Sequence, residues 1–380
     1  MFRNLWVILL LGLCLLQTPG CAKPTPARSG HESTRQAGYW KKQGAKFVLV
    51  NNFPQALKCY DRAIKINPGN ADVWFSRGLA LGALKKGDQA VNSFERAIQI
   101  NPRHDDALVA AGMLYVEQKK YQLAQQYFDR ARAINPRNDR AWVGDARLRQ
   151  LAGQYDQALA ACRRALELNS RNDQAWELQG QILAKQGQIP QALQSFETAV
   201  KLNPSYELHW YNQGWALADL KRWQEASNCF DRALLINPRH NESLVMKAWA
   251  LTQQGQYPEA LEWMNKAFEQ NPRQTAETWV DKGLLLNAMK RYSQAIACFD
   301  QALKIDPNNI RYWNIKARNL MTLKQYPQAL ECCEKALRLN PESAENWELK
   351  AACWYKLGRK AQALQCLERA ESLKAEKTGK

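Results

Sequence analysis

Small and apolar residues recur along the chain at a fixed interval, as alanine does at Ala56, Ala90, Ala124 and Ala158. The interval defines rows of about 34 residues, and ten rows cover residue 37 to about residue 377, with one extra residue between rows seven and eight. Positions 20 and 27 of every row are alanine, position 8 is glycine or alanine, and position 4 is tryptophan in eight rows. Within a row the apolar positions form two stripes with helical spacing, so each row predicts two antiparallel helices.

The ends of the rows carry turn signals. Seven of the ten rows close with Asn-Pro, as at Asn67-Pro68, Ser170 and Asp306 break the pair in two others, and the string INPRH ends both row two and row six. Proline cannot continue a helix, and asparagine tolerates the left-handed backbone that often closes one. We therefore expect a left-handed asparagine at each turn between rows. The small residues at positions 8, 20 and 27 predict close helix approach, with aromatic residues at positions 4 and 24 filling the remaining space.

The rows resemble the tetratricopeptide repeat (TPR), whose pattern of Trp, Gly, Tyr, Ala, Phe, Ala and Pro recurs over about 34 residues. The resemblance implies an all-α fold, an α-solenoid in which about ten helix-turn-helix units stack into a right-handed superhelix. The expected array spans residues 37–377, followed by a polar tail at 378–380. Its repeats start near residues 37, 71, 105, 139, 173, 207, 241, 276, 310 and 344.

Residues 1–21 follow a different pattern, with one basic residue, Arg3, before an apolar run from Leu5 to Leu16. A helix that crosses a bilayer needs about 20 apolar residues, so this run is too short to span. It has the length of the apolar region of a secretory signal peptide. We expect the chain to be exported.

The pair Gly20-Cys21 resembles the end of a bacterial lipobox, although Thr18 and Pro19 depart from the usual pattern. The resemblance implies acylation at Cys21, with residues 22–36 as a flexible tether. The expected location is then the membrane, with a lipid-anchored protein facing the periplasm or the cell exterior. A soluble periplasmic protein and an uncleaved anchor are the alternatives.

The formal charge of +17 indicates an anionic partner or environment, or else it only aids solubility. No constellation of catalytic residues is evident: the four histidines lack the spacing of metal ligands, and no glycine-rich loop suits a phosphate. His104 and the two aspartates after it are either a weak divalent-ion site or a helix start. We therefore expect no enzyme and no cofactor.

Ten cysteines occur, and seven of them lie at row position 23 or 24. Equivalent positions of stacked helices are roughly 10 Å apart, beyond the Cα separation of about 7 Å that a disulfide allows. We expect these cysteines to be small packing residues. A bridge from Cys332 or Cys333 to Cys366 is the exception to examine.

In the resembling family, positions 2, 5, 9 and 12 of the first helix line a concave groove. Along the array these positions form apolar, basic and aromatic zones, and Trp, Tyr and Arg are the residues that dominate binding hot spots. We expect a protein or peptide ligand with acidic groups; the alternative for Trp215 and Trp249 is packing against neighbouring helices. The predicted groove residues are Phe75, Leu79, Val109, Met113, Arg140, Arg147, Tyr211, Trp215, Val245, Trp249, Arg311, Asn314 and Arg318.

The function we expect is a non-catalytic scaffold of the cell envelope that helps to assemble a membrane complex. One alternative is a periplasmic assembly or delivery factor for a photosynthetic or secretion complex, with or without a divalent metal. Another is a regulator that docks a cell-wall or secretion enzyme. Nucleic acid is not an expected partner, because regular basic and stacking residues in each repeat are lacking.

Overall fold

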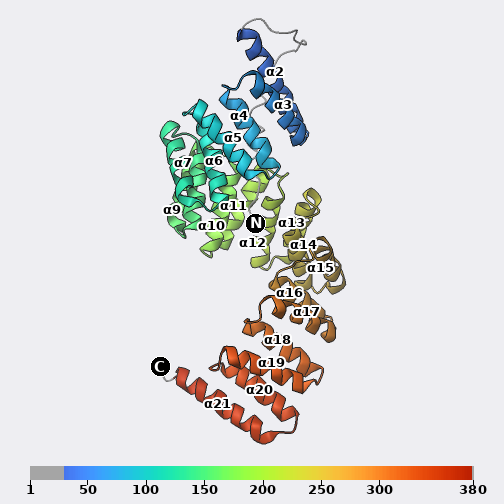
Figure 1. Ribbon diagram of the computed structural model, residues 1–380. Helices are drawn as coiled ribbons and strands as arrows, with labels where there is room; N and C mark the ends of the chain where they lie inside the picture. Colours follow the sequence, from blue (N-terminus) through green and yellow to red (C-terminus); the bar gives the residue numbers. More distant parts are fainter. Residues whose placement is uncertain (1–29, 379–380) are drawn as a thin grey trace. The chain divides into compact units, whose positions relative to one another are not determined.

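The computed structural model describes residues 30–378, which form twenty α-helices and no strand (Figure 1). The predicted all-α array of helix pairs is confirmed. The predicted signal segment and Cys21 lie outside the described residues. The first described helix, α2 (Gly30–Leu49), begins before the predicted first repeat, so residues 30–36 are helical although a tether was expected there.

The described residues up to Leu202 form one compact unit, called unit 1 below. Its helices pair in chain order, and the second helix of each pair also packs against the first helix of the next. The helices after α2 are α3 (Phe53–Ile66), α4 (Ala71–Ala83), α5 (Gly87–Ile100), α6 (Asp105–Glu117), α7 (Tyr121–Ile134), α8 (Asp139–Leu151), α9 (Tyr155–Leu168), α10 (Asp173–Lys185) and α11 (Ile189–Leu202).

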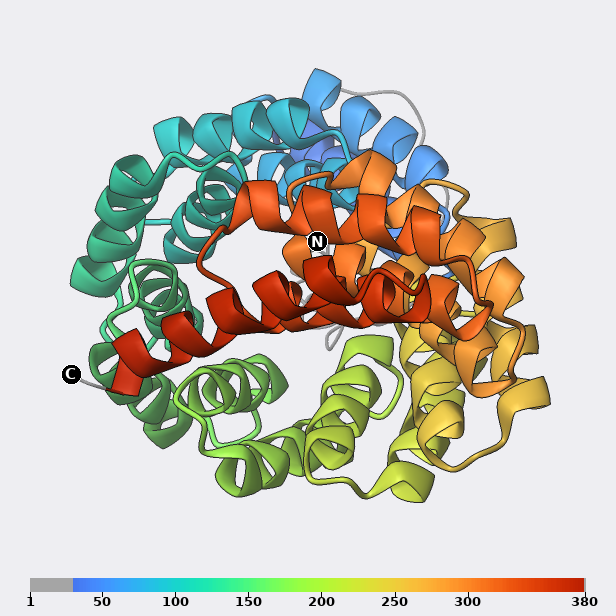
Figure 2. The ribbon, with the colours of Figure 1, turned by 90° about the horizontal axis from the view of Figure 1, so that it is seen from below.

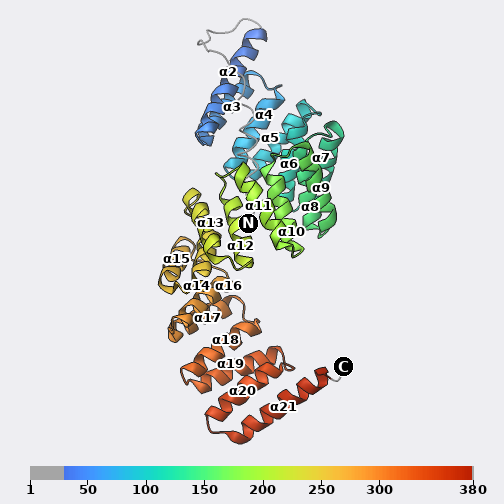
Figure 3. The ribbon, with the colours of Figure 1, turned by 180° about the vertical axis from the view of Figure 1, so that it is seen from behind.

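The described residues from Asn203 onward form the second compact unit, unit 2, with the same alternation of helices (Figure 3). The last two described helices run side by side along their length (Figure 2). The helices are α12 (Glu207–Asp219), α13 (Trp223–Ile236), α14 (Asn241–Gln253), α15 (Tyr257–Gln270), α16 (Ala276–Ala288), α17 (Tyr292–Ile305), α18 (Ile310–Thr322), α19 (Tyr326–Leu339), α20 (Ala344–Lys356) and α21 (Lys360–Thr378).

The two helices of a repeat meet where position 8 faces position 24. A Cβ atom added to Gly78 would lie 2.4 Å from the ring of Phe94, and one added to Gly180 would lie 2.5 Å from the ring of Phe196. A glycine therefore stands opposite each aromatic ring because no side chain fits there. The four repeats with alanine at position 8 carry a smaller or more flexible residue at position 24, in the pairs Ala146/Cys162, Ala248/Met264, Ala317/Cys333 and Ala351/Leu367.

The turns between repeats differ from the prediction. Asn67 has φ −135° and ψ 88°, an extended and not a left-handed conformation. The proline that follows disfavours helical dihedrals at the preceding residue and moves it toward the extended region. The side chain of Asn67 accepts a hydrogen bond from the amide of Gly69 at 3.1 Å and so closes the turn. The expectation of a left-handed asparagine here was wrong.

Left-handed residues occupy position 15 instead, in the turn inside each repeat. Four of these positions are glycine and one is asparagine, which tolerates the left-handed region, whereas five are lysine, for which that region is unfavourable. The sequence signal was the recurrence of glycine at position 15 in four repeats. The ten residues are Asn51, Lys85, Lys119, Gly153, Gly187, Lys221, Gly255, Lys290, Lys324 and Gly358.

Ion pairs join consecutive repeats, from position 7 of one repeat to position 25 of the repeat before it. The Arg77 guanidinium lies 2.7 Å from the Asp61 carboxylate, and the Lys316 ammonium lies 2.6 Å from that of Asp300. The same cations lie near the ring of the position-4 tryptophan, as Arg77 does over Trp74. These pairs are partly exposed and so contribute little stability individually. Lys350–Glu334 repeats the arrangement. Lys247–Asp231 repeats the ion pair, but Lys247 is buried and lies over the ring of Trp263, because position 4 of that repeat is Leu244.

The position-4 tryptophans have a structural role. The indole N–H of Trp74 donates to the carbonyl of Pro68 at 2.9 Å, and Trp313 bonds to Pro307 in the same way. Each tryptophan thereby ties the start of a first helix to the turn before it. Equivalent bonds are made by Trp142, Trp176, Trp210 and Trp347.

The eight cysteines of the described residues are all free and buried. The bridge to Cys366 considered above is not formed. Cys333 and Cys353 instead share a hydrogen bond between neighbouring helices, and this bond and burial raise the pKa of the Cys333 thiol. Burial also raises the pKa of Cys162 to about 12. The cysteines therefore act as packing residues, as expected.

We expect Gly78→Ala to lower the free energy of unfolding by about 1–3 kcal/mol, because the new methyl group overlaps the buried Phe94 ring. Helix propensity alone favours alanine by about 1 kcal/mol, so a loss isolates the clash. Denaturant unfolding followed by circular dichroism measures the change. In the double variant with Phe94→Met, which copies Ala248/Met264, the alanine should cost less than it does alone. A cost that is the same in both backgrounds would contradict the contact.

Candidate functional site

Four of the predicted groove residues belong to the core of unit 1. Phe75 is 5% exposed, Leu79 1%, Val109 0% and Met113 5%, and all four lie in one apolar cluster of unit 1. The Phe75 ring contacts the ring of Phe94 with a centroid distance of 5.8 Å. The prediction that these residues line a groove was wrong, because neighbouring helices cover them. An apolar residue at position 5 or 9 fits both roles, so the sequence could not separate them.

The predicted arginines of unit 1 are half-buried and engaged with neighbouring side chains. Arg147 of α8 donates to Gln181 of α10 at 3.0 Å and to Gln150 at 3.3 Å. Arg140 lies 3.7 Å from the carboxylate of Asp106 on α6. These contacts join successive first helices. The structure therefore assigns both arginines a role in stacking.

The aromatic zone of unit 2 is only partly covered. Tyr211 and Trp215 on α12, with Val245 and Trp249 on α14, are half-buried. Trp249 packs edge-on against Trp223 at a centroid distance of 4.9 Å. Trp249 therefore packs in part against a neighbouring helix, as the alternative expected, and part of its ring stays exposed. Its place in a binding groove stays a prediction.

Two contacts in this zone were not foreseen. Trp223 is the first residue of α13, and position 17 of the repeat is usually tyrosine, so its aromatic character was visible in the sequence but its partner was not. The ring of Tyr211 lies 5.2 Å from that of His240. Burial, together with the negative charge of Glu242, raises the pKa of Tyr211 to about 12. Tyr211 is therefore neutral at physiological pH.

The basic zone of unit 2 is exposed. On α18, Arg311 lies 3.5 Å from Glu277 and Arg318 lies 2.7 Å from Glu345, and their side chains are 60% and 56% exposed. Such exposed pairs contribute roughly 0–1 kcal/mol, so a ligand carboxylate can replace the internal partner at small cost. The predicted Asn314 lies between the two arginines in sequence. Its buried Oδ1 atom has no hydrogen-bond partner among the described residues.

A half-buried carboxyl group, that of Asp281, lies beside this zone. Burial, and secondarily the charge of Glu277 one helical turn earlier, raise the pKa of Asp281 to about 6, although Arg311 acts in the opposite direction. Glu277 in turn accepts a hydrogen bond from the hydroxyl of Tyr312 at 2.6 Å. The ionised form of Asp281 is thus disfavoured in the folded protein.

The histidine and aspartates at residues 104–106 start a helix. The Nδ1 atom of His104 accepts from the amide of Ala107 at 3.2 Å, and Asp105 accepts from the amide groups of Asn135 and Asn138. His240 caps α14 through the amide of Ser243 in the same way. No group of three His, Cys, Asp or Glu side chains in the described part of the chain is arranged to hold a metal ion.

The family models that match the chain describe tetratricopeptide repeats or a domain of a tetratricopeptide repeat protein. Models of the tetratricopeptide repeat match residues 44–85, 211–275, 276–309 and 310–343. A model described as the tetratricopeptide repeat protein 21 C-terminal ARM domain matches residues 75–241. The chain is a tetratricopeptide repeat protein. TPR proteins are scaffolds for protein–protein interaction, and none of the matching models describes a catalytic domain.

Solved structures are similar to this TPR protein at low sequence identity. The crystal structure of the APC/C hetero-tetramer Cut9-Hcn1 is 14% identical, with 83% of this chain and 76% of that chain covered and a TM-score of 0.57. A tetratricopeptide repeat protein from Parabacteroides merdae is 17% identical over 66% of this chain and 98% of its own, with a TM-score of 0.49. PilF of Pseudomonas aeruginosa is 18% identical over 54% and 93%, with a TM-score of 0.47. No curated protein sequence matches the TPR chain.

Within residues 30–378, no helix has both the length and the apolar character needed to cross a bilayer.

We expect Asp281→Asn to stabilise the TPR protein at pH 7.5 by about 1–3 kcal/mol, because it removes the cost of ionising a half-buried carboxyl group. Between an unfolded pKa near 3.8 and a folded pKa of about 6, the folded state binds more protons, so wild-type stability falls as pH rises through this window. The advantage of the variant should therefore vanish near pH 4. Urea unfolding at both pH values measures it; an equal advantage at both would contradict the assignment.

Proposed function

We propose that this TPR protein is a non-catalytic scaffold of the cell envelope that binds an extended partner segment on the first helices of unit 2. The binding surface, called the unit 2 face, comprises an aromatic part and an arginine part. It consists of Tyr211, Trp215, Val245 and Trp249 on α12 and α14, and of Arg311, Asn314 and Arg318 on α18.

The observation that carries the proposal is the partial exposure of Trp215 and Trp249. Both rings occupy position 9, where the equivalent Leu79 and Met113 of unit 1 are fully covered. Large apolar rings left in contact with water are a common mark of interaction sites. Tryptophan and tyrosine also supply a large contact area at little conformational cost.

The arginine part supports an acidic ligand. The guanidinium groups of Arg311 and Arg318 are solvated and held by exposed glutamates, so they can turn to a ligand without leaving a buried charge unpaired. Arginine binds carboxylates through two parallel hydrogen bonds.

The envelope location rests on the sequence before the described residues. The apolar run from Leu5 to Leu16 and the pair Gly20-Cys21 favour export and acylation. The scaffold would present the unit 2 face from the membrane surface and help to assemble a membrane complex.

We expect the double variant Trp215→Ala/Trp249→Ala to reduce capture of the partner from native membranes by about tenfold or more, because the largest apolar area of the unit 2 face is removed. Quantitative mass spectrometry after crosslinking measures the loss. Leu235→Ala is the matched control, since this side chain is 75% exposed on the second helix α13. Identical partner lists for wild type and the double variant would contradict the proposed site.

Stability has to be measured in parallel, because Trp249 also packs on Trp223. Loss of one edge-to-face pair costs about 0.5–1.5 kcal/mol, which should leave the helix content unchanged. Trp223→Phe retains an aromatic ring beneath Trp249 and should preserve partner capture.

We expect Cys21→Ser to abolish incorporation of labelled palmitate into the protein. The thiol of Cys21 is the group that the lipobox resemblance assigns to acylation. Cys14→Ser, in the apolar run, is the matched control and should retain the label. Retention of palmitate in the Cys21 variant would exclude this anchor.

A further inference from the structure

The turns inside the last three repeats form a strongly basic edge. Residues 287–294, 321–328 and 355–362 each contain the turn between a first and a second helix, and together they carry six basic residues and no acidic residue. The turns share one edge because the first helices of successive repeats run in the same direction. We call this set the basic edge: Lys290, Arg291, Lys324, Lys356, Arg359 and Lys360.

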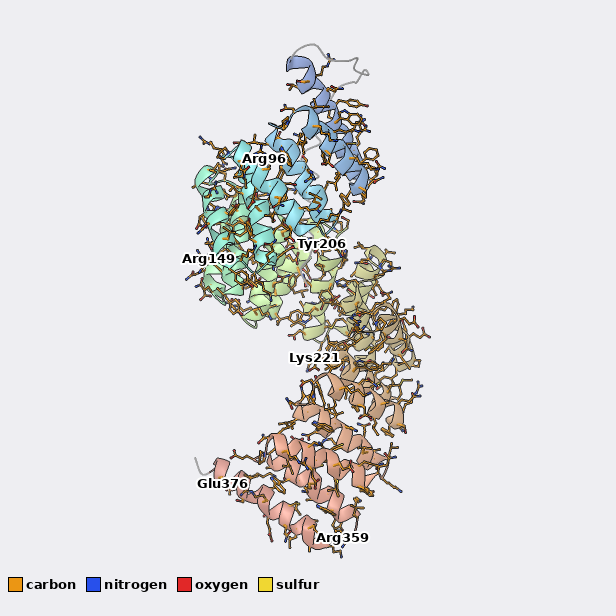
Figure 4. All side chains as sticks on the ribbon, viewed as in Figure 1. Arg96, Arg149, Tyr206, Lys221, Arg359 and Glu376 are labelled. Atoms are coloured by element: carbon orange, nitrogen blue, oxygen red, sulfur yellow. The ribbon has the colours of Figure 1, made fainter. Side chains whose placement is uncertain are left out.

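All six side chains of the basic edge are exposed. Over residues 30–378, none of them takes part in an ion pair. The corresponding turn of α12 and α13 differs, because Arg222 there is paired with Glu225 at 2.7 Å. Figure 4 shows Arg359 at the turn end of α21, with Glu376 at the opposite end of that helix. The charge of the basic edge is thus left for an external anion.

Exposed apolar residues are interleaved with these charges. Tyr355 is 62% exposed and Leu357 is 37% exposed, and Lys356 stands between them. Tyrosine with a neighbouring basic residue suits the boundary between water and lipid, where the ring enters the headgroup layer and the cation stays with phosphate. A nucleic-acid surface would instead need stacking aromatic residues repeated along the edge. The tyrosines of the other two turns, Tyr292 and Tyr326, are partly covered, so their rings offer less surface for stacking than Tyr355 does.

Two lysines of the basic edge are held in an unfavourable backbone conformation. Lys290 has φ 59° and Lys324 has φ 58°, whereas Gly255 and Gly358 occupy the same position in neighbouring repeats. The Cβ atom of a residue other than glycine is crowded by the following carbonyl in this left-handed conformation. Lys85, Lys119 and Lys221 adopt the same conformation in other repeats, so it belongs to the turn of the repeat and is not particular to the basic edge.

We propose that the basic edge docks the TPR array on an anionic lipid surface. This inference rests on the proposed envelope location and adds the orientation of unit 2. Contact through the turns leaves the helix axes pointing away from the bilayer. The unit 2 face runs along the sides of the first helices, so it stays open to a partner while the edge touches lipid.

The test uses the full chain carrying Cys21→Ser, so that acylation plays no part. Its sedimentation is measured with phosphatidylcholine vesicles and with vesicles in which part of that lipid is replaced by phosphatidylglycerol. The edge variant is Lys356→Gln/Arg359→Gln/Lys360→Gln. The control variant, Arg239→Gln/Arg273→Gln/Arg338→Gln, removes the same charge from exposed residues outside the basic edge.

We expect the edge variant to bind phosphatidylglycerol vesicles roughly 10- to 100-fold more weakly than the parent, since each basic residue near an anionic surface contributes about fivefold. The control variant should change less than threefold by the same reasoning. Binding to pure phosphatidylcholine, which the apolar N-terminal run can provide, should be equal for all three proteins. Failure of palmitate labelling at Cys21 would not alter these results, so the two proposals fail separately.

Two outcomes would overturn the inference. Equal losses in the edge and control variants would mean that net charge alone attracts the protein. A loss of binding to single-stranded RNA or to inorganic polyphosphate by the edge variant, with unchanged vesicle binding, would make the basic edge a site for a soluble polyanion.

Discussion

The array depends on the contact between position 8 of a first helix and position 24 of the second. In six repeats a glycine meets an aromatic ring at a distance that leaves no room for a Cβ atom, as Gly78 meets Phe94. The ring replaces the missing side chain and fixes how closely the two helices approach. Where alanine occupies position 8, a cysteine, methionine or leucine takes the place of the ring. Each repeat thus keeps the same spacing, on which stacking with its neighbours depends.

This regular packing makes the deviations informative. In the second and third repeats, positions 5 and 9 hold apolar side chains that the neighbouring helices cover, as for Val109, so these side chains belong to the core. In unit 2 the same positions carry Trp215 and Trp249, which are too large to be covered completely. Exposed arginines on α18 continue the series. The proposed binding surface therefore lies where side chains of the first helices are not fully covered by neighbouring helices.

The repeat period predicted the helix pairs and the packing cysteines, because both follow from one strong periodicity. It could not predict which face positions are covered, since Phe75 and Trp249 obey the same pattern and differ only in their neighbours. The turn chemistry was misjudged because the effect of proline on Asn67 outweighs the tolerance of asparagine for left-handed dihedrals. Ion pairs join position 7 of one repeat to position 25 of the repeat before it, as in Arg77–Asp61. The sequence shows the opposite charges at these positions, but only the helix packing shows that they are in contact.

The central claim is that the partner lies on the first helices of unit 2, and a crosslinker placed on that face tests it most directly. Leu284 is exposed at position 9 of α16, between the aromatic and arginine parts, and Leu235 is exposed on the second helix α13. A photoreactive amino acid at each site is activated in intact cells. The account predicts a partner adduct from residue 284 and none from residue 235. An adduct from residue 235 alone would contradict it and move the interaction to the second helices.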